Sequence, residues 1–187
     1  MPDEFSGRLE AGWIDGIRHI PSPNHDDRPN GESIVLIVIH AISLPPGQFG
    51  GSDIARLFTN TLDAGAHPYF AQISSLRVSA HFLIRRDGET IQFVSCDQRA
   101  WHAGLSCWRE RTRCNDFSIG IELEGTDDQP FADAQYRRLA GLIKLLSRHY
   151  PIAALAGHAD IAPGRKTDPG PHFAWARLAS PELPPHA

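Results

Sequence analysis

The chain has 187 residues, 41% of them apolar and 21% charged, which is enough for one globular domain with a sizeable core. Its formal net charge of −4, from 18 basic and 22 acidic residues without a block of like charges, argues against a nucleic-acid or membrane partner. The 3 cysteines match neither a disulfide framework nor a CxxC knuckle, and the amino terminus is acidic and broken by glycine, so we expect a cytoplasmic protein with reduced thiols.

The first strong element in the chain is the run IVLIVIH, residues 34–40, which is β-branched and almost continuously apolar. Such a run predicts a central strand buried on both faces, with His40 at its end. After a proline- and glycine-rich loop, residues 52–62 predict a helix with Ser52 or Asp53 as its N-cap.

A hairpin and a further strand follow. Residues 78–95 predict two strands joined by Arg86-Asp87-Gly88-Glu89, because an Asp-Gly pair suits a tight turn. The alternation in FSIGIELEG, residues 117–125, predicts a strand with apolar residues on one face and Ser118, Gly120, Glu122 and Glu124 on the other.

A long amphipathic helix is predicted for residues Asp133–Tyr150, because apolar positions recur there at spacings of three and four and Pro151 marks the end. The element order therefore predicts an α/β fold, a single domain over residues 1–187 with a mixed central β-sheet flanked by helices. We expect the proline-rich stretch 179–187 to be a flexible tail.

Two histidines stand at positions where sites are commonly built. His40 ends a predicted strand, and His158 lies in AGHADIAPGRKTDPG, too rich in proline and glycine to be a helix. A catalytic zinc ion takes three protein ligands and leaves a fourth position for water, so two histidines need an acid beside them. Asp160 and Asp168 both qualify by proximity, although a turn at Pro169-Gly170 would direct Asp168 back toward His158. Histidines that are merely hydrogen-bonded are the competing interpretation.

The two glutamates on the face of residues 117–125 allow two interpretations. Adjacent alternate carboxylates usually indicate a solvated strand face. Gly120 favours a site instead, because a glycine beside Glu122 lets another group approach closely.

Six blocks of sequence carry a resemblance that spans nearly the whole chain. They are VIHAISLPPGQFGG, HPYF, VSAHFLIRRDGETIQFVS, RAWHAG, CNDFSIGIELEGTD and GHADIAPGRKTDPG. In order and spacing these blocks resemble the AmpD-type N-acetyl-anhydromuramyl-L-alanine amidases. Phage amidase lysozymes and peptidoglycan-recognition proteins are relatives of that family by fold, so the resemblance implies the same mixed-sheet architecture.

The resemblance also implies a cofactor and a reaction. One zinc ion per chain would be held by His40, His158 and Asp168, with Glu122 and Lys166 assisting the chemistry. The reaction would be hydrolysis of the amide between the lactyl group of 1,6-anhydro-N-acetylmuramic acid and L-alanine in soluble muropeptides. This reaction belongs to cell-wall recycling, and in some Gram-negative bacteria its loss induces a chromosomal β-lactamase. We expect no obligate protein partner.

Substrate binding calls for an aromatic platform under the sugar and cations for the peptide carboxylates. Trp101, in the glycine-flanked RAWHAG, is predicted as the platform, with a core tryptophan as the alternative. Arg77 and Arg113 are predicted to pair with carboxylates, unless they are ordinary surface arginines. Tyr69 of the HPYF block completes the predicted substrate contacts.

His81 and His102 are predicted to lie behind the metal ligands or to face the substrate. One position departs from the family pattern: Ala41 stands where asparagine commonly follows the first zinc histidine. Because that position lies close to the substrate in the family, we expect Ala41 to affect catalytic efficiency but not metal binding. Two rival functions are a non-catalytic peptidoglycan-binding module and a phage-type endolysin that cuts intact wall.

Overall fold

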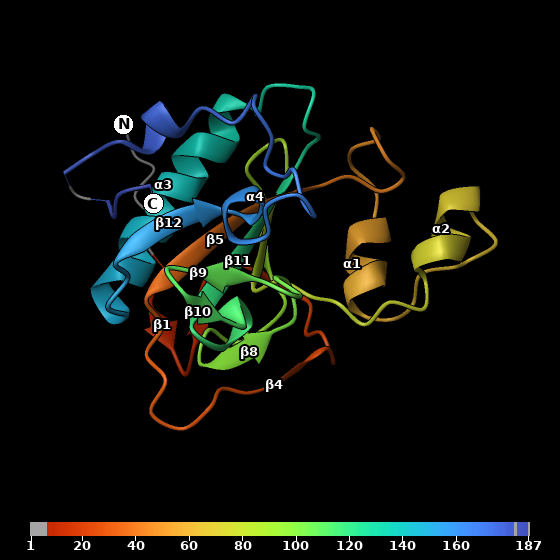
Figure 1. Cartoon of the computed structure of the whole chain (residues 1–187). Coiled ribbons are helices and arrows are strands. Elements are labelled where there is room, and N and C mark those ends of the chain that lie inside the picture. Colours follow the sequence, from red (N-terminus) through yellow and green to blue (C-terminus); the bar gives the residue numbers. More distant parts are fainter. Residues whose placement is uncertain (1–6, 182, 187) are drawn as a thin grey trace.

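The computed structural model describes residues 7–181 and 183–186. Its central sheet is built from β3 (Arg18–His19), β5 (Leu36–Ile42), β6 (Phe82–Ile84), β7 (Thr90–Gln92), β11 (Ser118–Glu124) and β12 (Ala154–Gly157). The six strands lie in the order β12-β5-β11-β6-β7-β3, and the first three of them are labelled in Figure 1. The first four are mutually parallel, β7 is antiparallel to β6, and β3 is parallel to β7. The predicted mixed central sheet is therefore confirmed.

Short elements surround this sheet. Three two-stranded pairs are β1 (Leu9–Glu10) with β2 (Trp13–Ile14), β4 (His25–Asp27) with β8 (Gln98–Ala100), and β9 (Cys107–Trp108) with β10 (Arg111–Thr112). The helices are α1 (Asp53–Phe58), α2 (Pro68–Ile73), α3 (Asp133–His149) and α4 (His158–Ile161), with 3-10 turns at η1 (Cys114–Asp116) and η2 (Trp175–Leu178).

Helix α3 covers one face of the sheet and closes the largest hydrophobic cluster. Its buried side chains pack against the alternate residues Ile37 and Ile39 of β5 and Ile119, Ile121 and Leu123 of β11. The Gln135 side chain fixes the start of the helix, because its amide donates to the carbonyl oxygens of Ile84 and Glu124. The amphipathic helix predicted for residues 133–150 is thus confirmed to within one residue.

We expect Leu142→Ala to lower the free energy of unfolding by about 2–5 kcal/mol, since it would leave a cavity beneath α3. Leu142 is fully buried in this cluster. Arg148→Ala, on the exposed side of the same helix, should change stability by less than about 0.5 kcal/mol. Denaturant unfolding of both variants checks the difference, and equal losses would contradict this assignment of the core.

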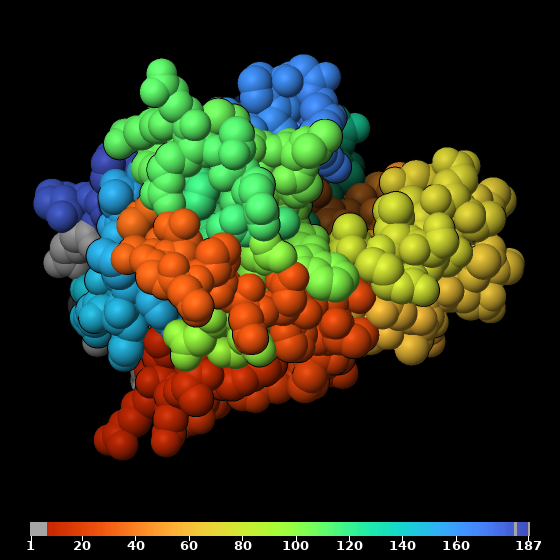
Figure 2. All heavy atoms as spheres, turned by 60° about the horizontal axis from the view of Figure 1, so that its bottom comes forward, coloured from red at the N-terminus to blue at the C-terminus, as the bar shows by residue number. Residues whose placement is uncertain are grey.

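The opposite face of the sheet is covered by the chain between β8 and β11 and by α1 and α2. Leu36 and Val38 of β5 pack there against Ala103, Trp108 and Phe117. A separate cluster lies under α1 and α2, which project with their flanking residues from one side of the molecule (yellow in Figure 2). This face therefore carries loops and short elements rather than a long helix.

Two predicted boundaries are wrong. Strand β5 continues past His40 to Ile42, because Ala41 and Ile42 still pair with β11. The helix predicted for residues 52–62 ends at Phe58, since Asn60 adopts a left-handed conformation with φ of 62°. The hairpin itself is confirmed, with Gly88 at φ 91° in the turn between β6 and β7.

Part of the stretch predicted to be flexible contacts the sheet. The backbone N–H of Leu155 donates to the carbonyl of Pro185 at 2.8 Å, and His186 stacks on Trp175 with ring centroids 3.6 Å apart. Across residues 7–181 and 183–186, no helix is long and apolar enough to span a membrane.

Candidate active site

Three neighbouring parallel strands bring polar side chains to one level of the sheet. In the register of β11 against β5, Glu122 pairs with His40, so the two side chains lie side by side on the same face. In the register of β12 against β5, Gly157 pairs with Ile39, which places the next residue, His158, beside His40. The carboxyl ends of parallel strands are where open α/β sheets commonly bind ligands.

His158 begins α4, a single helical turn that follows β12 directly. This turn lies within the segment predicted to be non-helical, so that prediction is wrong. The Asp160 side chain folds back and accepts from the Gly157 N–H at 2.6 Å, which stabilises the first turn. A Cβ on Gly157 would lie 2.8 Å from Cδ of Pro169, so the strand can meet the following loop only through glycine.

Asp168 reaches the same place from the loop after α4. The carbonyl of Asp168 accepts from the Ala159 N–H at 2.8 Å, which ties this loop to the helical turn. Its carboxylate then points at the two histidines, whereas the Asp160 carboxylate is occupied by Gly157 and His186. The geometry thus separates the two aspartates that the sequence left as alternatives.

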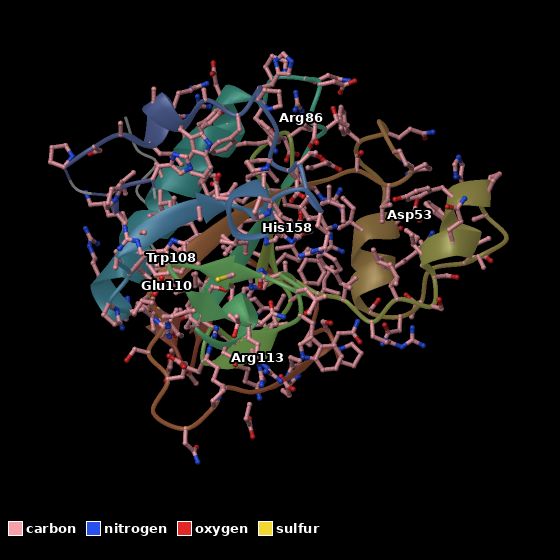
Figure 3. The ribbon with its side chains drawn as sticks, in the orientation of Figure 1. Asp53, Arg86, Trp108, Glu110, Arg113 and His158 are labelled. Atoms are coloured by element: carbon pink, nitrogen blue, oxygen red, sulfur yellow. The ribbon has the colours of Figure 1, made fainter. Side chains whose placement is uncertain are left out.

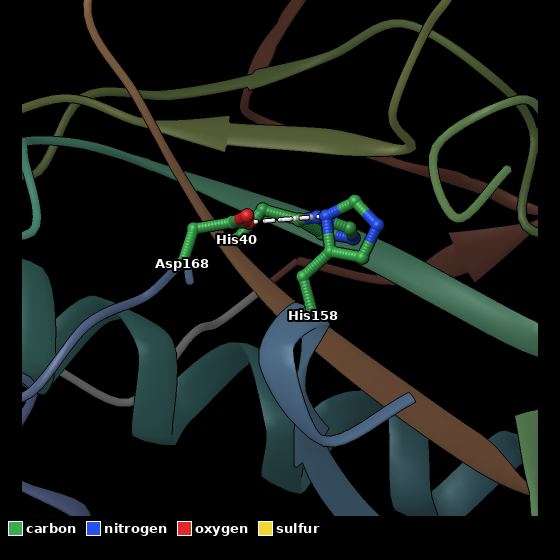
Figure 4. A group of neighbouring side chains, drawn as sticks. All are labelled: His40, His158 and Asp168. Atoms are coloured by element: carbon green, nitrogen blue, oxygen red, sulfur yellow. Dashed lines mark hydrogen bonds and ion pairs between the residues drawn. The ribbon is translucent and has the colours of Figure 1, made fainter. Parts of the chain in front are cut away.

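Three ligand atoms converge at one point (Figure 4). Nδ1 of His40 lies 3.0 Å from Nδ1 of His158, and Oδ2 of Asp168 lies 3.3 Å and 3.2 Å from these two nitrogens. Zinc bound tetrahedrally at its usual ligand distances separates its ligand atoms by about 3.3 Å. The three side chains therefore fit a zinc ion in spacing as well as in chemistry.

The protonation of the imidazoles agrees with this fit. Burial lowers the pKa of His40 to about 4, so its ring is neutral at pH 7. Nε2 of His158 lies 3.1 Å from the carbonyl oxygen of Ala103, an acceptor, so this nitrogen carries the proton and Nδ1 presents a lone pair. A hydrogen bond of this kind on the second ring nitrogen is typical of metal-binding histidines.

Glu122 lies beside the three convergent side chains but is not one of them. It is buried, and within the described part of the chain its Oε2 atom has no hydrogen-bond partner. Burial, with the Asp168 charge as a second cause, raises the pKa of Glu122 well above its usual value, while Lys166 opposes the shift. Such an unpartnered, buried carboxylate can exchange a proton with a reacting group.

The other carboxylate of the same strand has a different environment. Glu124 is buried and accepts from the backbone N–H groups of Gly50 and Arg86, and it forms an ion pair with Arg85 at 3.4 Å. All seven residues of β11 are buried, so the interpretation of this face as solvated is wrong.

The four predicted substrate-binding residues contact other parts of the structure. Trp101 donates from its indole to Asp26 at 3.1 Å. Arg113 pairs with Asp116 at 3.1 Å, and Figure 3 shows Arg113 apart from His158. Arg77 is exposed and donates to carbonyl oxygens of its own loop, and Tyr69 lies on α2, packed against the cluster beneath it. Their contact with a substrate stays a prediction.

Two further positions near the site differ from what the sequence suggests. Ala41 packs against the cluster under α3, on the face of β5 opposite to His40, and its effect on catalysis stays a prediction. Arg165, which the sequence did not single out, donates to the carbonyls of Ala103 and Leu105 at 2.7 and 2.6 Å. Arg165 thereby holds the loop that accepts the hydrogen bond from His158.

Comparisons with known proteins agree on one family. Residues 30–171 match the family of N-acetylmuramoyl-L-alanine amidases. The 1,6-anhydro-N-acetylmuramyl-L-alanine amidase AmpD of Escherichia coli is 60% identical over 172 residues, which are 91% of this chain and 94% of that protein. A crystal structure of a selenomethionine AmpD derivative superposes with a TM-score of 0.90 at 59% identity, covering 91% of this chain and 97% of the other.

A more distant structure carries a ligand. It is the complex of the Escherichia coli amidase AmiD with anhydro-N-acetylmuramic acid-L-Ala-D-γ-Glu-L-Lys, with a TM-score of 0.59 and 32% identity. The match covers 81% of this chain and 59% of that one.

Proposed function

Because the chain belongs to the N-acetylmuramoyl-L-alanine amidase family, we propose that it is a zinc-dependent amidase of soluble anhydromuropeptides. The bond cut would join the lactyl group of 1,6-anhydro-N-acetylmuramic acid to L-alanine. One observation carries the proposal: three atoms able to ligate zinc converge beside a buried carboxylate that has an unpartnered oxygen within the described residues. The similarity to AmpD further supports a cytoplasmic role in cell-wall recycling.

In this proposal His40, His158 and Asp168 hold the zinc ion. Two neutral imidazoles and one carboxylate leave the site with a net positive charge, which suits a reaction that develops negative charge on oxygen. When bound, zinc supplies Lewis-acid activation of a water molecule and of the amide carbonyl. The deep burial of the two histidines excludes bulk water from behind them.

Glu122 is proposed as the general base and then the general acid. This role is supported by the position of Glu122 on β11, next to His40 in register, and by the effect of the Asp168 charge on its pKa. It would take a proton from the attacking water and return it to the nitrogen of the leaving L-alanine, as the C–N bond breaks. The elevated pKa of Glu122 suits the second step, because a carboxyl group that holds its proton can donate it.

Lys166 is proposed to stabilise the negative charge that develops on the carbonyl oxygen. Its positive charge acts on both Glu122 and His40, where it lowers the pKa of each. A single donor in such a position contributes about 3 kcal/mol to the transition state. Trp101, Arg113, Arg77 and Tyr69 stay proposed substrate contacts, and the bond from Trp101 to Asp26 would hold the indole ring rigid under a sugar.

The purified protein should contain about one zinc ion per chain and should release free peptide from anhydromuramyl-tripeptide. Chelation should abolish the release, and added zinc should restore it. Metal analysis and mass spectrometry of the products check both. A metal-free protein that binds the fragment without cutting it would favour the peptidoglycan-binding module, and clearing of intact cell walls without cleavage of the soluble fragment would favour the endolysin.

A further inference from the structure

A line of hydrogen bonds runs from the candidate metal site into the core. Nε2 of His40 lies 2.9 Å from Nδ1 of His102, and Nε2 of His102 lies 3.3 Å from Oγ of Ser118. The Ser118 hydroxyl in turn lies 2.6 Å from the carbonyl oxygen of Cys114. All three side chains are buried, so water does not compete for these hydrogen bonds.

The direction of each hydrogen bond in this series follows from its last acceptor, the carbonyl oxygen of Cys114. A carbonyl oxygen only accepts, so the one proton of the Ser118 hydroxyl points to Cys114. Oγ of Ser118 must then accept from Nε2–H of His102, which leaves Nδ1 of the neutral His102 ring as an acceptor. His40 therefore donates from Nε2, and its Nδ1 atom carries a lone pair toward His158 and Asp168.

We propose that His102 and Ser118 are positioning residues that fix the protonated nitrogen of His40 and thereby set the metal affinity of the site. This inference rests on the proposed function, because it assigns these two residues a purpose only if His40 binds a metal. Without them, the His40 proton could move to Nδ1, where it would occupy the position of the metal.

The backbone around the hydrogen bonds that link His40, His102 and Ser118 leaves space for the His102 ring. A Cβ on Gly120 would lie 2.4 Å from Cγ of His102, so only glycine leaves room for the ring against β11. The Asn115 side chain accepts from the N–H groups of both His102 and Ala103, at 3.1 and 2.8 Å, which fixes the loop that carries the ring. One face of β11 therefore carries three residues of the site. Ser118 holds His102 by a hydrogen bond, Gly120 leaves room for the His102 ring, and Glu122 is the proposed proton carrier.

The test measures zinc affinity by chelator competition and the His40 tautomer by NMR of the ring nitrogens in metal-free protein. Wild-type His40 should carry its proton on Nε2. His102→Leu should weaken zinc binding by about 10- to 100-fold, as removal of partners behind metal ligands commonly does. His102→Asn should restore most of the affinity, because its side-chain oxygen can accept where Nδ1 did. Ser118→Ala should give a smaller loss and a mixture of His40 tautomers.

Ser95→Ala is the matched control, since Ser95 is also buried but its hydroxyl donates to the carbonyl oxygen of Ala11 instead of taking part in the hydrogen bonds of His40 and His102. It should leave zinc affinity and tautomer unchanged. If His102→Leu does not fold, Ser118→Ala and His102→Asn still decide the question. The proposal for His102 and Ser118 would be overturned if folded Ser118→Ala kept the zinc affinity and the His40 tautomer of the wild type. It would also be overturned if His40 carried its proton on Nδ1 in the wild type. Zinc binding without hydrolysis by the wild type would instead overturn the proposed function alone.

Discussion

Glu122→Gln should lower the rate of muropeptide hydrolysis by about 100- to 10,000-fold, the usual contribution of a general acid–base group. Glutamine keeps the shape of the side chain but neither takes a proton from water nor returns one to the leaving nitrogen. Because Glu122 lies beside the three convergent ligand atoms and is not among them, the variant should still bind about one zinc ion per chain. Turnover of anhydromuramyl-tripeptide and metal analysis of the same sample measure the two effects.

Glu124→Gln provides the matched control on the same strand face. Its carboxylate is engaged by Arg85 and by two backbone N–H groups, so its loss should lower the melting temperature. The turnover of the folded variant should stay within a few-fold of the wild type. Equal loss of turnover in both variants would contradict the assignment of Glu122 as the proton carrier.

The bounds of a helix or strand were predicted most accurately from the sequence where a clear apolar periodicity coincides with burial. Residues 117–125 and 133–150 alternate or repeat clearly, because each packs against the core along its whole length, and their bounds hold to within a residue or two. The candidate site was found from position along the chain: His40 was predicted at a strand end and His158 in a loop, where sites are commonly built, and the structure brings the two side chains together.

Other features depend on contacts that no local pattern encodes. His40 lies inside β5 rather than at its end, because pairing with β11 extends the strand to Ile42. The choice between Asp160 and Asp168 depends on a side chain that folds back onto Gly157. The hydrogen-bond directions around His102 depend on Ser118 and Cys114, which approach it only in the folded chain.

Asp168→Ala should weaken zinc binding by more than about 100-fold, beyond the effect of changes behind the ligands, and hydrolysis should fall to background. The variant removes the only charged side chain of the three convergent groups. The two neutral imidazoles that stay bind a cation more weakly than two imidazoles and a carboxylate do. Chelator competition measures the affinity, and excess zinc should not restore full turnover.

Asp160→Asn tests whether an aspartate close to His158 in sequence contributes to zinc binding. Asp160 lies two residues after His158 but directs its carboxylate to the Gly157 N–H and to His186, away from the convergent atoms. Asparagine can still accept the hydrogen bond from Gly157, so zinc affinity and turnover should both stay close to those of the wild type. If Asp160→Asn lost zinc while Asp168→Ala kept it, the third ligand would be Asp160. The loop after α4 would then need a conformation different from the one that the hydrogen bond between the Ala159 N–H and the Asp168 carbonyl stabilises.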